Sequence, residues 1–327
     1  MKIGIAGNGA IIPVFIEGAR RAGMEITEIC GRPQSMEKLQ KLADDYQIPV
    51  IRTDYAVMLA SENVEAVYIG VSNYMHYSYA KQALEAGRHV ICEKPFTSNY
   101  AQAKVLYDLA VEKHLYLFEA VMNQYNPLYG KVREALGGIG ELRMAELSFS
   151  QYSRRYDAFK AGEILPVFDP DKAGGALMDI NLYNIYFMVG LFGKPDRIRY
   201  QANIVRNIDT SGILTMEYEG FRASLIGAKD CSAPCRVSFH GDRGYLFSED
   251  AASRMTGFIL HRNDGSEERF VPQDHVPGMY YEMKEFLRMH DTGAWEEMKQ
   301  HLDVSLTVMQ ILDEARNQAG IRTDFEV

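Results

Sequence analysis

The sequence has few of the residues that mark a disulfide-rich or metal-binding protein. It contains four cysteines and one tryptophan in 327 residues, and no two cysteines form a CxxC pair. Cys231 and Cys235 are four residues apart, but no further Cys or His pair stands close by to complete a zinc site. We therefore expect free thiols, buried or half-buried, in a reducing cytoplasm, and no bound metal.

Basic charge and long apolar segments are also scarce. The 35 lysines and arginines are outnumbered by 44 aspartates and glutamates, which gives a formal net charge of −9. A nucleic-acid partner would require a basic face, whereas a local basic pocket for a phosphorylated cofactor is compatible with this balance. No apolar run approaches the roughly 20 residues that span a membrane, and the N-terminus lacks a secretory pattern. We expect a cytoplasmic protein with no nucleic-acid or membrane partner.

The first 120 residues alternate between apolar strands and amphipathic helices. Ser35 and Asp54 are suited to cap the helices that follow them, and Ser98 begins a long helix. Nearly continuous apolar strands that alternate with helices predict a parallel sheet covered on both faces. We expect strands at 2–6, 25–30, 50–51, 64–71, 88–92 and 115–120, and helices at 12–23, 36–46, 54–59, 76–87 and 98–113.

After about residue 125 the pattern changes to several short extended runs joined by turns, which predicts an antiparallel sheet with helices on one face. The expected fold class is α/β, with an N-terminal Rossmann doubly wound parallel sheet and a C-terminal α+β domain that has a largely antiparallel open sheet. We place the domains at 1–122 and 123–327, and the C-terminal helices could pack back on the first domain. The expected strands are 141–150, 198–204, 212–218, 222–228, 236–240, 244–248 and 258–260, and the expected helices are 128–136, 176–191, 279–289 and 302–319.

The N-terminal stretch MKIGIAGNGAII joins the first expected strand to the first helix. Gly7 allows a tight turn, Gly9 allows a pyrophosphate to come close, and the helix start supplies free N–H groups. A dinucleotide loop usually has Gly or Ala at the third position, where this chain has Ile12, followed by Pro13. Ile12 fits if the helix stands slightly further from the strand, and Pro13 fits a first helical turn. We interpret the stretch as a working nucleotide loop, the alternative being plain turn chemistry.

The end of the second strand bears on which nucleotide is bound. NAD-binding folds usually have Asp or Glu there to bind the ribose 2′-hydroxyl. Here the strand ends in Cys30-Gly31-Arg32, and Glu28 lies inside the strand. Arg32 is well placed for a 2′-phosphate, so we expect NADP(H), with NAD as the other candidate. The alternative is that Arg32 is a solvated loop charge and specificity is loose.

Two further sets of residues have the chemistry of a catalytic site. Glu93 and Lys94 end a buried strand, where charges are costly unless they are paired or used. They are either an ion pair that fixes a loop or a lysine that contacts a reacting oxygen. Asp179 and Tyr183 are four residues apart and share a helix face. They are either a first-turn carboxylate with an ordinary buried tyrosine or part of a proton relay.

Together these motifs make the chain resemble the glucose–fructose oxidoreductase, inositol dehydrogenase and rhizopine-catabolism (Gfo/Idh/MocA) family. The matching motifs cover essentially the whole chain: the glycine loop, VSNYMH, ALEAGRHVICEKP, GGALMDINLY and SLTVMQILDEARNQAGI. The tyrosine in GGALMDINLY, with FDPDKAGG before it, is most similar to the dihydrodiol and D-xylose dehydrogenase branch. NADP is the usual cofactor of that branch, in agreement with Arg32.

The resemblance implies roles for individual residues. Lys94 would contact the nicotinamide ribose and the reacting oxygen, Asp179 would help to bind substrate, and Tyr183 would stand where other members have an acid/base histidine. Asn73 and His76 would line the cofactor cleft, although His76 could equally be a helix-start residue that only packs. The catalytic candidates are Lys94, Asp179 and Tyr183, and the cofactor-binding candidates are Gly7, Gly9, Ala10, Ile11, Arg32, Asn73, His76, Glu93 and Lys94. In the family the antiparallel sheet is a common dimerisation surface, which implies a homodimer or higher homo-oligomer.

Two positions depart from the family pattern. Asn181 stands where the family often has Gly, and Gln124 stands where many members have Arg. The loss of that positive charge changes what the pocket would bind and leaves the substrate open.

The expected function is an NAD(P)-dependent oxidoreductase. Hydride would pass between the cofactor and a sugar, polyol or related small molecule, while Lys94 and Tyr183 handle the hydroxyl proton. Two alternatives keep the same fold: a non-catalytic NADP(H)-binding sensor, and a glycosidase that recycles its nicotinamide within each turnover.

Overall fold

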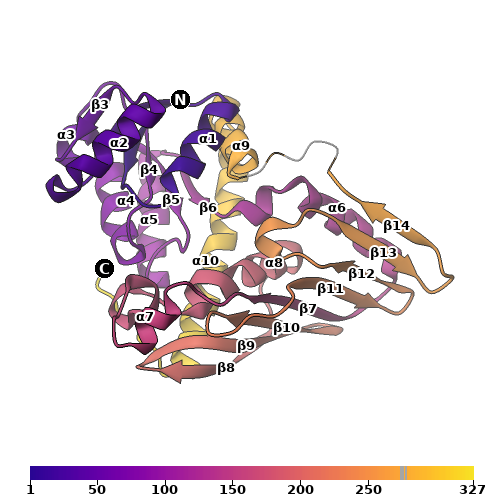
Figure 1. Cartoon of the computed structure of the whole chain (residues 1–327). Coiled ribbons are helices and arrows are strands. Elements are labelled where there is room, and N and C mark those ends of the chain that lie inside the picture. Colours follow the sequence, from indigo (N-terminus) through magenta and orange to yellow (C-terminus); the bar gives the residue numbers. More distant parts are fainter. Residues whose placement is uncertain (273–275, 277) are drawn as a thin grey trace. The chain divides into compact units, whose positions relative to one another are not determined.

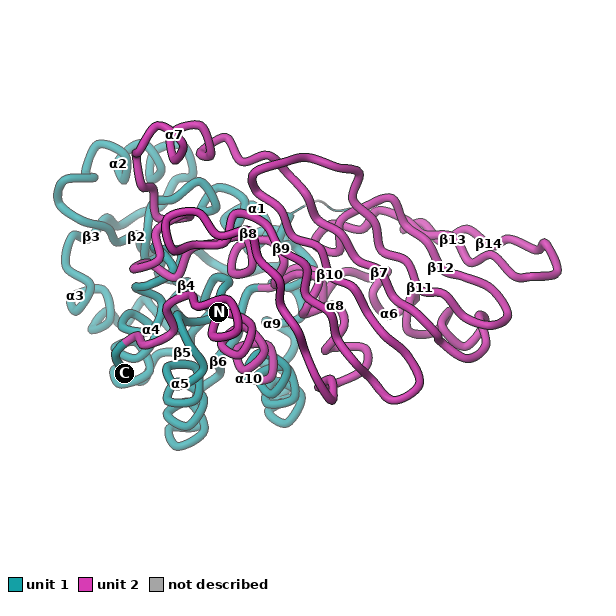
Figure 2. Tube along the Cα trace, turned by 90° about the horizontal axis from the view of Figure 1, so that it is seen from below, with its two compact units in different colours: residues 1–120, 276–306, 326–327 teal, residues 121–275, 307–325 magenta. Residues whose placement is uncertain are grey.

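The computed structural model describes residues 1–272, 276 and 278–327, and the chain divides into two compact units. Unit 1 comprises residues 1–120, 276–306 and 326–327, drawn in teal in Figure 2. Unit 2 comprises residues 121–275 and 307–325, drawn in magenta. Segments from the C-terminal part of the sequence therefore belong to both units.

Unit 1 is built on a parallel sheet of six strands in the order β3-β2-β1-β4-β5-β6 (Figure 1). This is the strand order of a doubly wound dinucleotide-binding sheet, which confirms the predicted Rossmann fold. The order reverses between β1 and β4, and ligands of such sheets bind beyond the carboxyl ends of the strands at this point. The strands are β1 (Lys2–Ala6), β2 (Glu25–Cys30), β3 (Val50–Arg52), β4 (Ala66–Ile69), β5 (His89–Glu93) and β6 (Leu117–Ala120).

Most helices of unit 1 begin and end close to where the sequence predicts, but the last helix begins at Trp295 rather than at residue 302, and Ser35 makes no capping hydrogen bond to the helix that follows it. The Asp54 carboxylate caps α3 by accepting hydrogen bonds from the N–H groups of Ala56 and Val57, as expected. The long helix α5 begins two residues later than predicted, because Asn99 rather than Ser98 accepts the N–H of Gln102. The helices are α1 (Ile12–Ala22), α2 (Met36–Tyr46), α3 (Tyr55–Leu59), α4 (His76–Glu85), α5 (Tyr100–Lys113), α9 (Tyr280–Asp291) and the first part of α10 (Trp295–Gln318).

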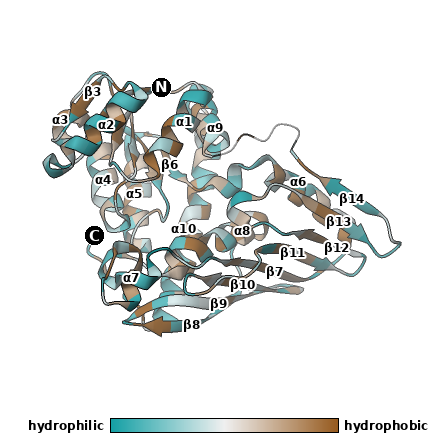
Figure 3. Cartoon of the chain, viewed as in Figure 1, coloured by the Kyte–Doolittle hydropathy of each residue, from teal (hydrophilic) through white to brown (hydrophobic). Residues whose placement is uncertain are grey.

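Buried apolar faces hold these helices in unit 1. Helix α2 carries both colours in Figure 3, because its sequence contains both apolar and charged residues. Leu39, Leu42 and Ala43 are buried, while its charged residues are exposed. Helix α9 packs against α1, although the two are far apart in the sequence. The ring of Tyr68 on β4 stacks on that of Phe15 on α1, with 3.5 Å between the ring centroids. These contacts position the loop between β1 and α1.

Unit 2 contains an eight-stranded sheet in the order β14-β13-β12-β11-β7-β10-β9-β8. Neighbouring strands are antiparallel except for β7 and β10, which run parallel, so the predicted largely antiparallel sheet is confirmed. The prediction missed β14, because its sequence EERF lacks alternating apolar residues. The strands are β7 (Leu142–Ser150), β8 (Arg197–Val205), β9 (Ile208–Tyr218), β10 (Phe221–Ala228), β11 (Arg236–Gly241), β12 (Gly244–Ser248), β13 (Phe258–Arg262) and β14 (Glu267–Phe270).

Helix α8 (Leu182–Phe192) is the core helix of unit 2 and packs on β7 and β10. The prediction of one helix over 176–191 was incomplete, since a π-helical turn at Leu177–Asn181 precedes α8. The expectation that no apolar run approaches the length of a membrane span was also wrong. By length and composition alone, Pro170–Phe192 is long and apolar enough to cross a membrane. However, 78% of its most apolar window is buried inside the structure, as in the core helix of a globular unit. The other helices of unit 2 are α6 (Pro127–Ala135), α7 (Tyr156–Lys160) and the second part of α10.

Candidate active site

The loop between β1 and α1 requires glycine at its first position. Gly7 has a φ of +123°, and a Cβ atom there would lie 2.4 Å from the carbonyl oxygen of Gly70. The N–H of Gly7 donates to the carbonyl of Cys30 at 2.9 Å. Gly7 therefore fixes the turn that leads from the sheet into the helix.

Gly9 differs, because the fold does not need glycine at this position. A Cβ atom at Gly9 would meet only the carbonyl oxygen of Gly70 within 4 Å, at an ordinary contact distance of 3.6 Å. Helix α1 begins beside Gly9 with no side-chain cap and no acidic residue in its first turn. Free N–H groups and the positive end of the helix dipole are thus available to an anion. This open cradle fits the pyrophosphate of a dinucleotide.

The missing third glycine is balanced by a glycine on another strand end. Ile12 is fully buried at the start of α1, and a Cβ atom at Gly70, just after β4, would lie 2.8 Å from its Cδ1 atom. The side chain of Ile12 thus occupies space that Gly70 leaves empty. Pro13 lies in the first turn of α1, as predicted. The large and small residues are thus exchanged between the start of α1 and the end of β4.

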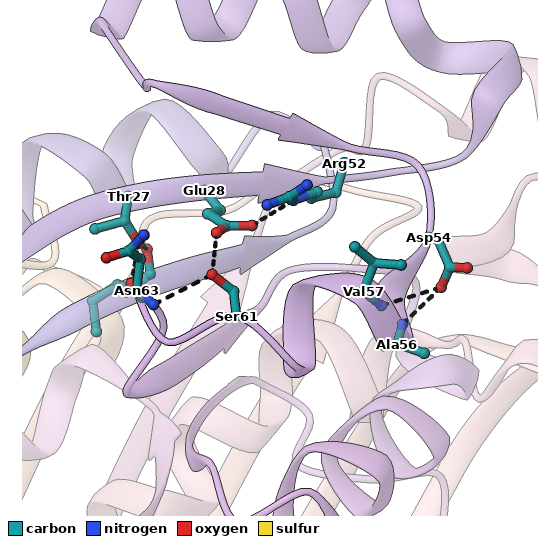
Figure 4. A network of polar contacts seen from close by, with 9 residues as sticks. Thr27, Glu28, Arg52, Asp54, Ala56, Val57, Ser61 and Asn63 are labelled. Atoms are coloured by element: carbon teal, nitrogen blue, oxygen red, sulfur yellow. Dashed lines mark hydrogen bonds and ion pairs between the residues drawn. The ribbon is translucent and has the colours of Figure 1, made fainter.

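The polar groups near the end of β2 are arranged as Figure 4 shows. Glu28 is fully buried, and its Oε2 atom accepts a hydrogen bond from Nε of Arg52 at 2.8 Å. The hydroxyl of Ser61 donates to the other oxygen of the same carboxylate. Arg32, at the strand tip, is exposed, and within the described part of the chain its side chain makes no hydrogen bond or ion pair. Glu28 is thus committed to the interior, while Arg32 is available to a ligand.

The end of β5 fixes the backbone of Lys94. Glu93 is 8% exposed, and its carboxylate accepts from the hydroxyl of Tyr68 at 2.7 Å and from the N–H of Lys94 at 3.2 Å. Burial raises the pKa of Glu93, and the Tyr68 hydroxyl and the charge of Lys94 oppose that rise. The peptide bond between Lys94 and Pro95 is cis. Glu93 therefore orients the segment that carries Lys94.

His76 lies at the start of α4 with both ring nitrogens near backbone carbonyl groups. Nδ1 is 2.8 Å from the oxygen of Pro95, and Nε2 is 3.2 Å from the oxygen of Val71. The side chain is 1% exposed, and burial lowers its pKa to about 4. These contacts favour the packing alternative for His76, which ties α4 to the segment after Lys94. Asn73 begins the short helical turn (Asn73–Met75) that precedes α4 and is half-buried.

In unit 2, close backbone approaches fix the GGALMDINLY segment. A Cβ atom at Gly174 would lie 2.8 Å from the carbonyl oxygens of both Pro166 and Val167. Gly175 has a φ of +107°, and a Cβ atom there would clash with Oδ1 of Asp209. The Oδ2 atom of Asp209 accepts from the N–H of Leu177 at 2.6 Å. The two glycines and the buried Asp209 therefore set where the following helical turns begin.

Asp179 and Tyr183 follow on consecutive turns. Asp179 belongs to the π-helical turn Leu177–Asn181, a rare element that is frequent at functional sites. Tyr183, on α8, is 7% exposed, and the side-chain amide of Asn123 donates to its backbone carbonyl at 2.8 Å. Asp179 forms an ion pair with Lys229, at the end of β10. Asp179 and Tyr183 are thus held on one helical segment of unit 2.

Lys229 and Asn123 are the residues that the sequence prediction missed. Lys229 directly follows β10, whose last two residues are buried, and this strand-end position resembles the one that drew attention to Lys94. Asn123 follows β6 but gave no sequence signal, because its bond to Tyr183 depends on the tertiary fold.

Of the two departures from the family pattern, Asn181 has a structural explanation. Asn181 is 1% exposed and donates to the carbonyl of Leu225, and a Cβ atom at Gly227 on β10 would lie 2.5 Å from its Cβ. Asn181 therefore joins the helix to the sheet. The Nε2 atom of Gln124 lies 2.9 Å from where a Cβ atom of Gly190 would be, about two turns along α8 from Tyr183.

The cysteines and potential metal ligands add no further site. All four cysteines are among the described residues and are free, as predicted. Cys30 and Cys92 are buried and Cys235 is half-buried, but Cys231 is exposed, so the expectation of buried or half-buried thiols was wrong for Cys231. Among residues 1–272, 276 and 278–327, no three His, Cys, Asp or Glu side chains gather to hold a metal ion.

A doubly wound sheet with an open anion cradle at the start of α1, joined in one chain to an α+β unit with a large open sheet, is typical of a dinucleotide-binding protein. Residues 1–121 match the model of an oxidoreductase family with an NAD-binding Rossmann fold, and residues 131–247 match the GFO/IDH/MocA C-terminal domain. The chain belongs to the GFO/IDH/MocA oxidoreductase family, which confirms the resemblance and the enzyme class predicted from the sequence.

Individual relatives are similar over nearly the whole chain. The NADP⁺-dependent scyllo-inositol 2-dehydrogenase of Bacillus subtilis is 31% identical, covering 98% of this chain and 98% of its own length. The NADP⁺-dependent D-xylose 1-dehydrogenase of Hypocrea jecorina is 27% identical and covers 98% and 92%. A 3-ketoreductase from Actinomadura kijaniata, crystallised with NADP and TDP-benzene, has the same fold, with a TM-score of 0.80, 22% identity and 97% coverage of both chains.

Proposed function

We propose that this chain is an NADP(H)-dependent dehydrogenase or reductase that acts on a hydroxyl-bearing carbon of a sugar or polyol. The observation that carries the cofactor assignment is the contrast at the tip of β2, where Glu28 is committed to Arg52 and Ser61 while Arg32 is exposed. Relatives named for NADP⁺-dependent action on scyllo-inositol and D-xylose support the substrate class. When bound, the cofactor supplies or accepts the hydride.

Unit 1 provides the residues that hold the cofactor in this proposal. The backbone of Gly7, Gly9, Ala10 and Ile11 would bind the pyrophosphate at the start of α1, and Arg32 would bind the 2′-phosphate. Asn73 and the segment that His76 supports would line the nicotinamide side. Lys94 would direct its ammonium at the reacting oxygen, where a cation stabilises a developing alkoxide. Glu93 would keep the Lys94 backbone in place through the N–H bond described above.

Unit 2 provides the residues that bind substrate and move its proton. Tyr183 would exchange the hydroxyl proton as general acid or base, and its backbone is held by Asn123. Asp179 would accept hydrogen bonds from substrate hydroxyl groups. Its place on a π-helical turn, supported by Asp209 at the turn's start, gives it a fixed backbone position.

The test is nicotinamide absorbance at 340 nm with NADP⁺ or NAD⁺ against a panel that includes scyllo-inositol, myo-inositol and D-xylose. We expect turnover with NADP⁺, and a loss of about 100-fold or more in kcat for Lys94→Ala. Lys104→Ala is the matched control, since Lys104 is a lysine of unit 1 whose side chain is 45% exposed and pairs with Asp108. Undiminished turnover in Lys94→Ala would overturn the role of Lys94. NADPH binding without turnover on any substrate would favour a sensor, and sugar release without net reduction would favour a nicotinamide-recycling glycosidase.

We also propose that the chain forms a cytoplasmic homodimer through the outer face of its eight-stranded sheet. Met144, Ile213 and Tyr245 are exposed on β7, β9 and β12 of this sheet, and large exposed apolar residues on a sheet face are typical of an interface. Sedimentation should give a dimer mass that Ile213→Lys shifts towards the monomer. A monomeric wild-type chain would contradict the dimer, and cell fractionation tests the location.

A further inference from the structure

Lys229 is a buried lysine for which neither the fold nor the roles proposed above account. It directly follows β10, where its N–H donates to the carbonyl of Thr210 and its carbonyl accepts from Ser153, both at 2.9 Å or less. Its side chain is 8% exposed. A buried ammonium is costly unless it is paired, so this position requires a reason.

The partner of Lys229 is the carboxylate of Asp179. The Nζ atom of Lys229 donates to Oδ2 of Asp179, whose side chain is 28% exposed. The ammonium also lies 5.8 Å from the ring centroid of Phe168, a fully buried residue. Lys229 therefore lies on the inner side of the pair, and the more exposed member is Asp179.

The difference in exposure between Lys229 and Asp179 suggests that the lysine supports the carboxylate rather than the core. A lysine that served only the core could be replaced by an apolar side chain of similar length, because buried ion pairs contribute little net stability. A charge-assisted hydrogen bond restricts the rotamer of a carboxylate. Lys229 can thus hold the Asp179 carboxylate in one orientation, as a substrate hydroxyl acceptor requires.

We infer that Lys229 is a positioning residue of the substrate site, which acts through its ion pair with Asp179 to recognise hydroxyl groups of a neutral polyhydroxy substrate. The inference rests on the proposed function, in which Asp179 binds substrate. Lys229 itself need not touch the substrate, so its contribution appears in substrate binding rather than in the chemical step.

The test compares Lys229→Met, Lys229→Arg and Asp179→Asn with the unmodified enzyme, using NADP⁺ and scyllo-inositol or D-xylose. We expect Lys229→Met to raise KM about tenfold or more with little change in kcat, the loss typical of a charge-assisted hydrogen bond. Lys229→Arg should recover most of the loss, and the NADPH dissociation constant from fluorescence titration should not change. Lys131→Met is the control, because Lys131 is an exposed lysine of unit 2 paired with Glu134.

A double variant shows whether Lys229 acts through Asp179. Lys229→Met combined with Asp179→Asn should have the same KM as Asp179→Asn alone, and a higher melting temperature, since it removes the uncompensated buried ammonium. If Asp179→Asn raises KM and Lys229→Met does not, the inference about Lys229 is wrong while the proposed function stands. If Asp179→Asn leaves KM and kcat unchanged, the proposed role of Asp179 fails instead. An increase in KM for Lys131→Met equal to that for Lys229→Met would also overturn the inference.

Discussion

The exchange of large and small residues between Ile12 and Gly70 can be tested by a double-mutant cycle. A Cβ atom at Gly70 would lie 2.8 Å from Cδ1 of Ile12 and 3.0 Å from Cε1 of Tyr68, both in the buried core of unit 1. Overpacking of this kind costs typically about 1–3 kcal/mol, so Gly70→Ala should lower the free energy of unfolding by that amount. Ile12→Val removes the Cδ1 atom itself and should cost about 0.5–1.5 kcal/mol.

The double variant separates this explanation from two independent losses. In the double variant Gly70→Ala/Ile12→Val, the new methyl group occupies the space that Cδ1 vacated. The double variant should therefore lose about 1 kcal/mol less unfolding free energy than the sum of the losses in the two single variants. Urea unfolding followed by circular dichroism measures all four proteins. Gly9→Ala is the control in the same loop, because a Cβ atom there makes only an ordinary 3.6 Å contact. If the loss in the double variant equals the sum of the two single losses to within about 0.5 kcal/mol, the proposed exchange is refuted.

Three further predictions follow from unit 1. Burial lowers the pKa of His76 from 6.5 to about 4. The free energy of unfolding should therefore fall by about 3 kcal/mol as the pH drops from 6.5 to 4, because the unfolded state binds the proton more readily. Urea titrations should show a smaller fall in the free energy of unfolding for His76→Gln over the same pH range. Burial raises the pKa of Glu282 well above its usual value, and neither of its carboxyl oxygens has a hydrogen-bond partner within the described residues. Glu282→Gln should therefore melt at a higher temperature than wild type at pH 8, with the difference shrinking as the pH falls towards 4.5; equal gains at both pH values would contradict this cause. Arg32→Ala should weaken NADPH binding by about 10- to 100-fold and leave NADH binding unchanged in calorimetry, and an equal loss for both cofactors would argue against a 2′-phosphate contact.

The sequence predicted unit 1 well because its signals are local. Apolar runs, helical periodicity and the Asp54 cap each depend on a few neighbouring residues, and β1 and β2 have the predicted bounds. The strand expected at 64–71 was too long, since only Ala66–Ile69 pairs with neighbouring strands. Unit 2 was harder in three places: β14 has a charged sequence, the five-residue helix α7 was not predicted, and the π-helical turn before α8 has no periodicity that distinguishes it from an α-helix.

The candidate site was predictable in part, for a similar reason. Strand-end positions drew attention to Lys94 and Arg32, but Ile12 in the nucleotide loop and Asn181 in the GGALMDINLY motif could be interpreted only with their tertiary partners known. Ile12 faces Gly70, and Asn181 faces Gly227. In both places a glycine distant in the sequence makes room for the larger residue, and no local pattern records such a pairing.

The most direct test of the central claim is to follow the hydride itself. The enzyme is given NADP⁺ and the substrate that the absorbance screen identifies, with deuterium on the carbon that bears the reacting hydroxyl. The account predicts that deuterium appears at C4 of the nicotinamide in the NADPH formed, as detected by NMR, and that Lys94→Ala binds NADPH but forms this product about 100-fold or more slowly. NADPH binding without reduction of NADP⁺ by any sugar or polyol of the panel, or deuterium recovered only in solvent, would contradict it.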